Sequence, residues 1–177
     1  MLSLEEIKSL FLPVPDFPVK GIIFQDITPV FKHPKGLSSI VFHWQEHLKK
    51  LPHKVDVICG IESRGFILGA ALSSSCGLPF IPLRKAGKLP RDSFKVSYEL
   101  EYGNASLELH KDALLPEQRV LVIDDVLATG GTMLASLSLI RQAKAYGLPS
   151  CLVNLSFLQG QKALENEGYN PFSLIHF

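Results

Sequence analysis

Residues 120–132 read Val-Leu-Val-Ile-Asp-Asp-Val-Leu-Ala-Thr-Gly-Gly-Thr. The four apolar residues at the start are typical of a strand that is buried on both faces of a sheet. Asp124 and Asp125 follow where we expect this strand to end, and a short glycine-containing turn comes next. Apolar residues then recur at helical spacing from Thr132 to Ile140. The stretch therefore predicts a strand, a loop and a helix of an α/β fold.

The loop at residues 128–132, here the phosphate loop, has the features of an anion site. Its backbone N–H groups and the dipole of the following helix favour a phosphate, and the hydroxyls of Thr129 and Thr132 add donors. Asp124 and Asp125, here the acid pair, would repel a phosphate, so they are expected to face sugar hydroxyls, directly or through a divalent cation. The pattern therefore predicts a sugar phosphate ligand. The simpler alternative is a buried strand and an ordinary turn, with Asp124 capping the helix. No lysine follows the glycines, which excludes a Walker loop, and the spacing is not GxGxxG.

Strand and helix patterns alternate along the rest of the chain. The expected helices are 4–11, with a capping box from Ser3 and Glu6, and then 36–51, 66–75, 132–146 and 160–167. The expected strands are 55–59, 79–83, 119–124, 151–157 and 172–177, with a hairpin formed by 93–98 and 106–110, while 17–31 is predicted to be loop and short strand. This alternation predicts one domain with a mainly parallel sheet and right-handed crossovers.

Three of the expected strands end in chemically distinctive residues. Ligands bind at the carboxyl ends of parallel strands, so we expect residues 60–65, Arg84 and Lys85, and the acid pair to share one rim of the sheet. Arg64, Arg84, Lys85 and Lys88 would concentrate positive charge there, which suits a polyanion such as pyrophosphate. A solvated basic turn is the alternative for residues 84–88.

The stretch at 120–132 resembles the phosphoribosyl-pyrophosphate (PRPP) signature of the type I phosphoribosyltransferases. Further segments resemble the adenine phosphoribosyltransferases in order and spacing: FPVKGIIFQDITP (17–29), GIESRGFILG (60–69), RKAGKLP (84–90) and YELEYGNASLELHKDAL (98–114). The similarity continues to Pro-Phe-Ser-Leu at 171–174, nearly the whole chain. It implies a central, mainly parallel sheet flanked by helices, with a small N-terminal hood (about residues 1–33) and a flexible β-hairpin lid (about residues 90–111).

The resemblance implies a purine-salvage enzyme that transfers the 5-phosphoribosyl group of PRPP to adenine, giving AMP and pyrophosphate. The acid pair would bind the ribose hydroxyls. Mg²⁺ would be held mainly by the substrate, with Asp124 or Asp125 as candidate protein ligands. The residues implied for the 5-phosphate are those of the phosphate loop: Ala128, Thr129, Gly130, Gly131 and Thr132.

The resemblance also assigns residues to pyrophosphate and to the base. Glu62, Ser63 and Arg64, here the pyrophosphate loop, match a family segment in which a cis peptide bond is usual, and we expect that bond between Glu62 and Ser63. Arg84, Lys85 and Lys88 would add cations. Adenine would lie between the hood and the phosphate loop, against Ile23, Phe24, Gln25 and Ala128. Phe24 can stack on a purine or be a plain core residue of the hood.

The implied catalytic residues are Glu101 and Tyr102 on the lid, together with Arg64. Glu101 matches the family's general base, a role typically worth about 10²–10⁴-fold in rate. An exposed hairpin charge is the alternative for Glu101, and Glu99 and Glu108 are its local competitors. Closure of the lid would exclude water from the reacting centre.

One position departs from the family pattern. Relatives commonly carry Arg where this chain has Gln25 in the base-binding segment. If that segment recognises the base through its backbone, the change is tolerable. If an Arg side chain normally contacts the base, then adenine affinity or orientation would differ.

Bulk properties exclude several classes of protein. The 177 residues carry a net charge of +1, which gives no broad basic footprint for nucleic acid. Cys59, Cys76 and Cys151 lie among apolar residues and form no CxxC pair, which indicates reduced core residues of a cytoplasmic protein. No apolar run approaches the length of a membrane helix. The resemblance also implies a homodimer.

Three other functions remain open from the sequence. The first is a phosphoribosyltransferase for a 6-oxopurine or a pyrimidine, which would differ in the hood and the lid. The second is a non-catalytic PRPP-sensing regulator, for which an added DNA-binding segment or a basic face would be expected. The third is a pyrophosphokinase-like homologue, for which no nucleotide site is evident.

Overall fold

The computed structural model describes residues 1–17, 20–21, 23–100 and 103–177. The helices are α1 (Leu4–Ser9), α2 (Thr28–Lys32), α3 (Gly36–Leu48), α4 (Arg64–Cys76), α5 (Gly131–Gln142) and α6 (Gly160–Asn166). The strands are β1 (Leu12–Pro15), β2 (Ile23–Asp26), β3 (Val57–Ile61), β4 (Phe80–Lys85), β5 (Ser93–Leu100), β6 (Gly103–His110), β7 (Arg119–Leu127), β8 (Tyr146–Asn154) and β9 (Phe172–His176).

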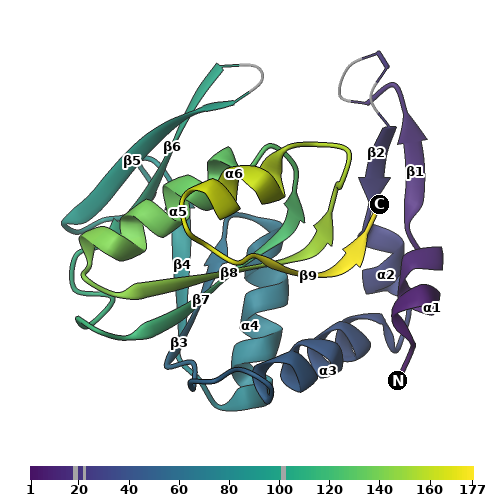
Figure 1. Cartoon of the computed structure of the whole chain (residues 1–177), viewed down its shortest axis with the longest axis horizontal. Helices are drawn as coiled ribbons and strands as arrows, with labels where there is room; N and C mark the ends of the chain where they lie inside the picture. Colours follow the sequence, from purple (N-terminus) through teal and green to yellow (C-terminus); the bar gives the residue numbers. More distant parts are fainter. Residues whose placement is uncertain (18–19, 22, 101–102) are drawn as a thin grey trace.

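A seven-stranded sheet in the order β5-β6-β4-β3-β7-β8-β9 forms the centre of the molecule (Figure 1). The neighbouring strands β4, β3, β7, β8 and β9 pair in parallel. The hairpin β5–β6 extends the sheet beyond β4, because β6 pairs antiparallel with β4. The parallel arrangement directs the carboxyl ends of β3, β4 and β7 toward the same rim. The expected α/β fold with a mainly parallel sheet is confirmed.

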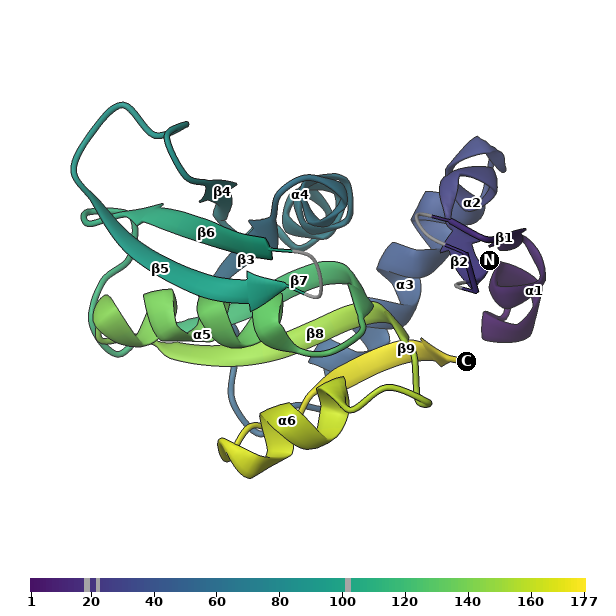
Figure 2. The same cartoon turned by 90° about the horizontal axis from the view of Figure 1, so that it is seen from above.

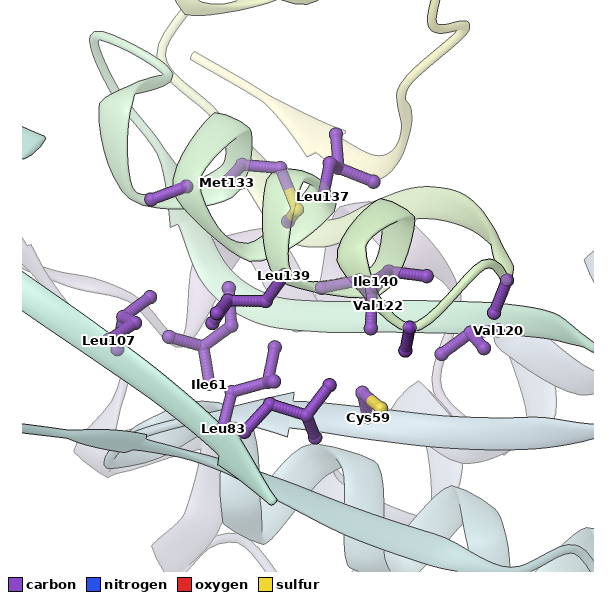
Figure 3. Close-up of a cluster of buried hydrophobic side chains, with 14 of the residues drawn as sticks. Cys59, Ile61, Leu83, Leu107, Val120, Val122, Met133, Leu137, Leu139 and Ile140 are labelled. Carbon is purple, nitrogen blue, oxygen red and sulfur yellow. The ribbon is translucent and has the colours of Figure 1, made fainter. Parts of the chain in front are cut away.

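Alternation along the central strands fills two hydrophobic cores. On β7, Val120 and Val122 face one core, while Leu121 and Ile123 face the other. Helix α5 covers the first core, where its side chains meet those of β3, β4, β6 and β7 (Figure 3). Helices α3 and α4 cover the second core, where Trp44 is fully buried and donates to Ser150 Oγ at 2.7 Å. Complete burial of each large apolar side chain contributes about 1.5–3 kcal/mol, so the two cores hold the rim rigidly.

Two arms flank the rim. The small antiparallel sheet β1–β2, with α1 and α2, lies in the segment expected to form the hood. It is at the β9 end of the large sheet, and the hairpin β5–β6 lies at the opposite end (Figures 1 and 2). Both arms rise on the side toward which β3, β4 and β7 point (Figure 1). The space above the central strands is therefore bounded by an arm on each side.

Strand β7 is longer than expected. We expected it to end at 124, but it continues to Leu127 because β8 pairs with it as far as Leu127↔Asn154, while its other neighbour β3 stops at Gly60↔Ile123. The acid pair therefore lies in the last part of a strand that has lost one of its two partners.

The segment after α5 also differs from the prediction. Helix α5 ends at Gln142, and Lys144, with φ of 60°, reverses the chain so that β8 begins at Tyr146 instead of 151. Pro149 made this segment unattractive as a strand, because proline lacks an N–H donor. Strand β9 pairs with β8 only from Ser150 onward, so Pro149 precedes that ladder.

The N-terminal region contains both a confirmed prediction and two missed elements. Ser3 and Glu6 form the expected capping box, although α1 ends at Ser9 and not at 11. Neither β1 nor α2 was predicted, because both are short and contain proline. Helix α3 ends at Leu48, three residues earlier than expected.

Cys59 and Cys151 are buried as expected, while Cys76 is only half-buried. Within the ranges described above, no helix is long and apolar enough to cross a membrane.

Candidate active site

The pyrophosphate loop leaves the end of β3, whose five residues are all buried. The peptide bond between Glu62 and Ser63 is cis, as expected, and α4 begins at Arg64. A Cβ on Gly65 would lie 2.6 Å from the carbonyl oxygen of Ile123, so only glycine allows α4 to approach β7 this closely. This approach brings Arg64 next to the acid pair.

Arg64 connects the hood to the acid pair. Its Nε lies 2.7 Å from Asp125 Oδ2, in an ion pair that does not meet the geometry of a hydrogen bond. Its guanidinium carbon also lies 5.4 Å from the centre of the Phe24 ring, within range of a cation–π contact. Arg64 thus contacts Phe24, which we expect to bind the base, and Asp125, which we expect to bind the ribose.

Glu62 organises the basic residues that follow β4. Its carboxylate accepts hydrogen bonds from Arg84 Nε at 3.0 Å and from Lys88 Nζ at 2.6 Å, and a third bond comes from the Lys85 backbone N–H at 2.9 Å. Burial alone would raise the pKa of Glu62, but these hydrogen bonds outweigh it and lower the pKa to about 2. Glu62 is therefore ionised, and it engages the side chains of Arg84 and Lys88, two of the four cations that we expected to hold pyrophosphate.

The acid pair has the opposite electrostatic character. Burial of Asp124 and the neighbouring charge of Asp125 raise the pKa of Asp124 well above its ordinary value of 3.8. The backbone N–H of Asp125 donates to Asp124 Oδ1 at 2.9 Å, which offsets only part of this cost. Asp125 is 4% exposed, and Arg64 is its ionic partner. The pair therefore carries unfavourable charge that a cation or sugar hydroxyls could relieve.

A cavity of about 720 Å³ opens between these groups. Its lining combines the pyrophosphate loop, Lys85, the acid pair and Thr132. This volume is of the size that binds a small-molecule ligand. The predicted convergence of three strand ends on one rim is confirmed.

Other predicted site residues lie at the border of the cavity or away from its lining. Arg84 and Lys88 are turned to Glu62. Ala128, Thr129 and Gly130 connect β7 to α5, which begins at Gly131, and none of these four residues lines the cavity. In β2, Phe24 and Gln25 are half-buried, while Ile23 is exposed. Glu101 and Tyr102 lie outside the described residues. Their assignment to the general base and its neighbour stays a prediction.

Sequence reasoning missed several residues of the lining. Tyr98 and Ser106 reach the cavity from the hairpin, with Ala86 and Ala105 beside them. Alternation in the hairpin gave no signal for this set, because the neighbouring pairs Tyr98↔Ala105 and Ser97↔Ser106 lie on opposite faces of β5 and β6. Glu108, a competitor for the role of general base, instead accepts from the Gly87 N–H at 3.0 Å, a contact that shapes the turn after β4.

Comparisons with known proteins agree with this geometry. Residues 27–161 match the family model of the phosphoribosyl transferase domain. The chain is 49% identical over 178 residues to an adenine phosphoribosyltransferase of Francisella philomiragia, covering 99% of this chain and all of the relative. The crystal structure of the adenine phosphoribosyltransferase of Thermoanaerobacter pseudethanolicus matches with a TM-score of 0.92 and 45% identity over 99% of this chain and 100% of the other. That of the Saccharomyces cerevisiae enzyme, complexed with an imino-altritol bisphosphate and adenine, matches with a TM-score of 0.92 and 37% identity over 97% of both chains. The chain belongs to the phosphoribosyltransferase family and, within it, to the adenine phosphoribosyltransferases.

Proposed function

We propose that this protein transfers the 5-phosphoribosyl group of PRPP to adenine, producing AMP and pyrophosphate. The observation that carries the proposal is the cavity that unites Arg64, Lys85, Asp125 and Thr132 at one rim of the sheet. A cation-rich end and an acidic end next to a phosphate loop match the pyrophosphate, ribose and 5-phosphate parts of PRPP. The family relationship supports adenine as the base.

The reaction places opposite charges on the two sides of the anomeric carbon. A bond forms between a ring nitrogen of adenine and this carbon, while its bond to pyrophosphate breaks and the electron pair leaves with pyrophosphate. Arg64 and Lys85 stabilise the leaving group, because cations already in position offset the negative charge that develops on it. The acid pair faces the ribose, where positive charge develops. The proton of the adenine imidazole ring passes to Glu101, which the lid carries.

Mg²⁺ fits the donor chemistry of the acidic end. Carboxylate oxygens are the protein ligands that Mg²⁺ prefers, and burial together with the charge of Asp125 raises the pKa of Asp124, a cost that a nearby cation would reduce. Nevertheless, in the described part of the chain no group of three or more His, Cys, Asp or Glu side chains could hold a metal ion. Asp124 or Asp125 would contact Mg²⁺ that the substrate mainly holds, and the ion would neutralise charge on the pyrophosphate.

The two arms complete the proposed site. The hood binds the base through Ile23, Phe24 and Gln25, and Phe24 exchanges its contact with Arg64 for a contact with adenine. The hairpin β5–β6 acts as the lid, with Tyr98 and Ser106 at the cavity wall. We also propose a homodimer, which exposed apolar side chains such as Ile67 on α4 support. Sedimentation velocity at several concentrations tests the dimer.

A base panel tests the proposed reaction. Wild-type protein is assayed spectrophotometrically with PRPP and Mg²⁺ against adenine, hypoxanthine, guanine and uracil, alongside Glu101→Ala. We expect AMP from adenine alone and a loss of at least about 100-fold in kcat for Glu101→Ala. Glu99→Ala, on the same hairpin, is the matched control and should retain most activity. Turnover of a 6-oxopurine would overturn the choice of base and point to Gln25, and PRPP binding without any turnover would favour a regulator.

A further inference from the structure

The first residue of α6 lies directly behind the phosphate loop. Gly160 is buried, and a Cβ at this position would lie 2.2 Å from the carbonyl oxygen of Ala128 and 3.1 Å from the backbone nitrogen of Gly130. The first distance is an overlap and the second is a tight contact, so any side chain at Gly160 would push the loop away from α6. The obstructing atoms belong to the backbone, which cannot rotate away as the end of a flexible side chain can.

The contact is equally close from the other side. Gly130 has φ of 91°, a left-handed conformation that glycine adopts readily, and it immediately precedes α5. A Cβ on Gly130 would lie 3.0 Å from the carbonyl oxygen of Gly160. The loop and α6 therefore meet backbone to backbone, and the position of α6 limits where the N–H groups of the loop can point.

The first turn of α6 is itself anchored to the sheet. Asn154, 2% exposed at the end of β8, donates through Nδ2 to Gln161 Oε1 at 2.8 Å. Just before the loop, the backbone N–H of Leu155 donates to the carbonyl oxygen of Leu127 at 3.0 Å. The ends of β7 and β8 thus fix both sides of the contact between Gly160 and the loop. Helix α6 lies on the α5 side of the sheet (Figures 1 and 2).

We propose that Gly160 is a positioning residue for the 5-phosphate of the ribose: its missing side chain lets α6 hold the phosphate loop in its binding shape. This inference rests on the proposed function, because it assigns the loop to that phosphate. Gly160 acts through the backbone of Ala128 and Gly130 and touches no substrate. Its effect is therefore confined to ligands that carry the 5-phosphate and does not extend to pyrophosphate, which binds at residues 62–64 and Lys85.

Calorimetric titration of Gly160→Ala with two separate ligands tests the proposal. We expect the affinity for ribose 5-phosphate to fall by at least about tenfold, because displacement of a positioning group by a fraction of an ångström is costly. The affinity for pyrophosphate with Mg²⁺ should stay at the wild-type value. In steady-state assays, KM for PRPP should rise more than kcat falls.

Gly147→Ala is the matched packing control. A Cβ on Gly147 would lie 2.5 Å from Leu137 Cδ2, so this change disturbs packing between β8 and α5 without facing the phosphate loop. It should lower stability without selective loss of ribose 5-phosphate. The proposal would be overturned if Gly147→Ala showed the same selective loss of affinity for ribose 5-phosphate as Gly160→Ala. It would also be overturned if Gly160→Ala lowered the affinities for both ligands equally.

A milder variant keeps the test decisive if Gly160→Ala does not fold. Gln161→Ala removes the bond to Asn154 from an exposed position, and Lys162→Ala, exposed on the same turn, is its control. Gln161→Ala should lower the affinity for ribose 5-phosphate selectively, while Lys162→Ala should leave the affinities for both ligands unchanged. Wild-type affinity for ribose 5-phosphate in Gln161→Ala would contradict the role of α6. If wild-type protein itself binds no ribose 5-phosphate, the proposed function fails before the role of Gly160 is tested.

Discussion

The two charged regions of the rim, the pyrophosphate loop and the acid pair, differ in how their charges are balanced. Glu62 lies among donors from Arg84, Lys85 and Lys88, and its pKa is lowered to about 2. The acid pair crowds two carboxyl groups at the end of β7, and the pKa of Asp124 is raised. In the first region donors of the protein balance the charge of Glu62, whereas in the second region Arg64 alone faces two carboxyl groups, which a cation or sugar hydroxyls could stabilise further.

This difference indicates what each region contributes to binding. Pairing within the protein fixes the shape of the pyrophosphate loop before the ligand arrives, which lowers the entropy cost of binding. The acid pair destabilises the free protein, and bound sugar hydroxyls or Mg²⁺ would remove this destabilisation. Stability is commonly sacrificed in this manner at functional sites.

The largest expected effect is that of Asp125→Ala. This change removes the ionic partner of Arg64 and one of the two carboxylates proposed for the ribose. We expect kcat/KM for PRPP to fall by about 100-fold, because both the ribose and Arg64 lose their positions. Steady-state kinetics measure the loss, and circular dichroism checks the fold. Activity within about threefold of wild type would show that the acid pair does not hold the ribose.

An intermediate effect separates Lys85 from Lys88. Lys85 lines the cavity, whereas the ammonium group of Lys88 is bound to Glu62. Lys85→Met should weaken pyrophosphate by about tenfold or more, the worth of one charged hydrogen bond, and Lys88→Met should weaken it much less. Calorimetric titration with pyrophosphate and Mg²⁺ gives both values. A larger loss for Lys88→Met would restore Lys88 as a direct contact and indicate that it leaves Glu62 when the ligand binds.

The smallest expected effect is a pair of opposite pH dependences of stability. Because the folded-state pKa of Glu62 is lowered from 4.5 to about 2, its contribution is present above 4.5 and is lost as the pH falls through this window. Asp124 has a raised pKa, so its contribution is full below 3.8 and is lost as the pH rises through the raised value.

Urea unfolding at a series of pH values checks these two signs. Glu62→Gln should flatten the decline of stability below pH 4.5, and Asp124→Asn should flatten the decline above pH 3.8. At neutral pH, Asp124→Asn should stabilise the protein by about 0.5–2 kcal/mol, because it removes a crowded charge. Destabilisation of Asp124→Asn at neutral pH would mean that the acid pair is already compensated.

Much of the fold could be predicted because its strands and helices have strong periodic patterns. The buried strand ending in the acid pair, the glycine-rich loop and the residues after β3 and β4 located the rim correctly. The end of β7 could not be predicted, because it depends on β8 pairing beyond the point where β3 stops. Helix α2 and strand β1 escaped because each has at most five residues and contains proline.

The sequence predicted which residues lie in the site better than it predicted which of their side chains bind one another. Sequence spacing indicated that Arg84, Lys85 and Lys88 lie near the pyrophosphate loop, but not that Glu62 engages two of these side chains. The approach of Gly160 to Ala128 was equally invisible, because the two lie on separate elements that only the folded chain brings together. Partners distant in sequence are determined by the tertiary fold, which no local pattern encodes.

The central claim is that the two regions of the rim bind separate parts of one substrate. Calorimetric titration of Glu62→Gln and Asp124→Asn with pyrophosphate and with ribose 5-phosphate, each in the presence of Mg²⁺, tests it most directly. We predict a crossed result: Glu62→Gln weakens binding of pyrophosphate and retains binding of ribose 5-phosphate, while Asp124→Asn, which leaves the ion pair of Arg64 with Asp125 in place, weakens binding of ribose 5-phosphate and retains binding of pyrophosphate. If each variant, still folded, weakens both ligands to the same extent, the two regions act as one, and the account is contradicted.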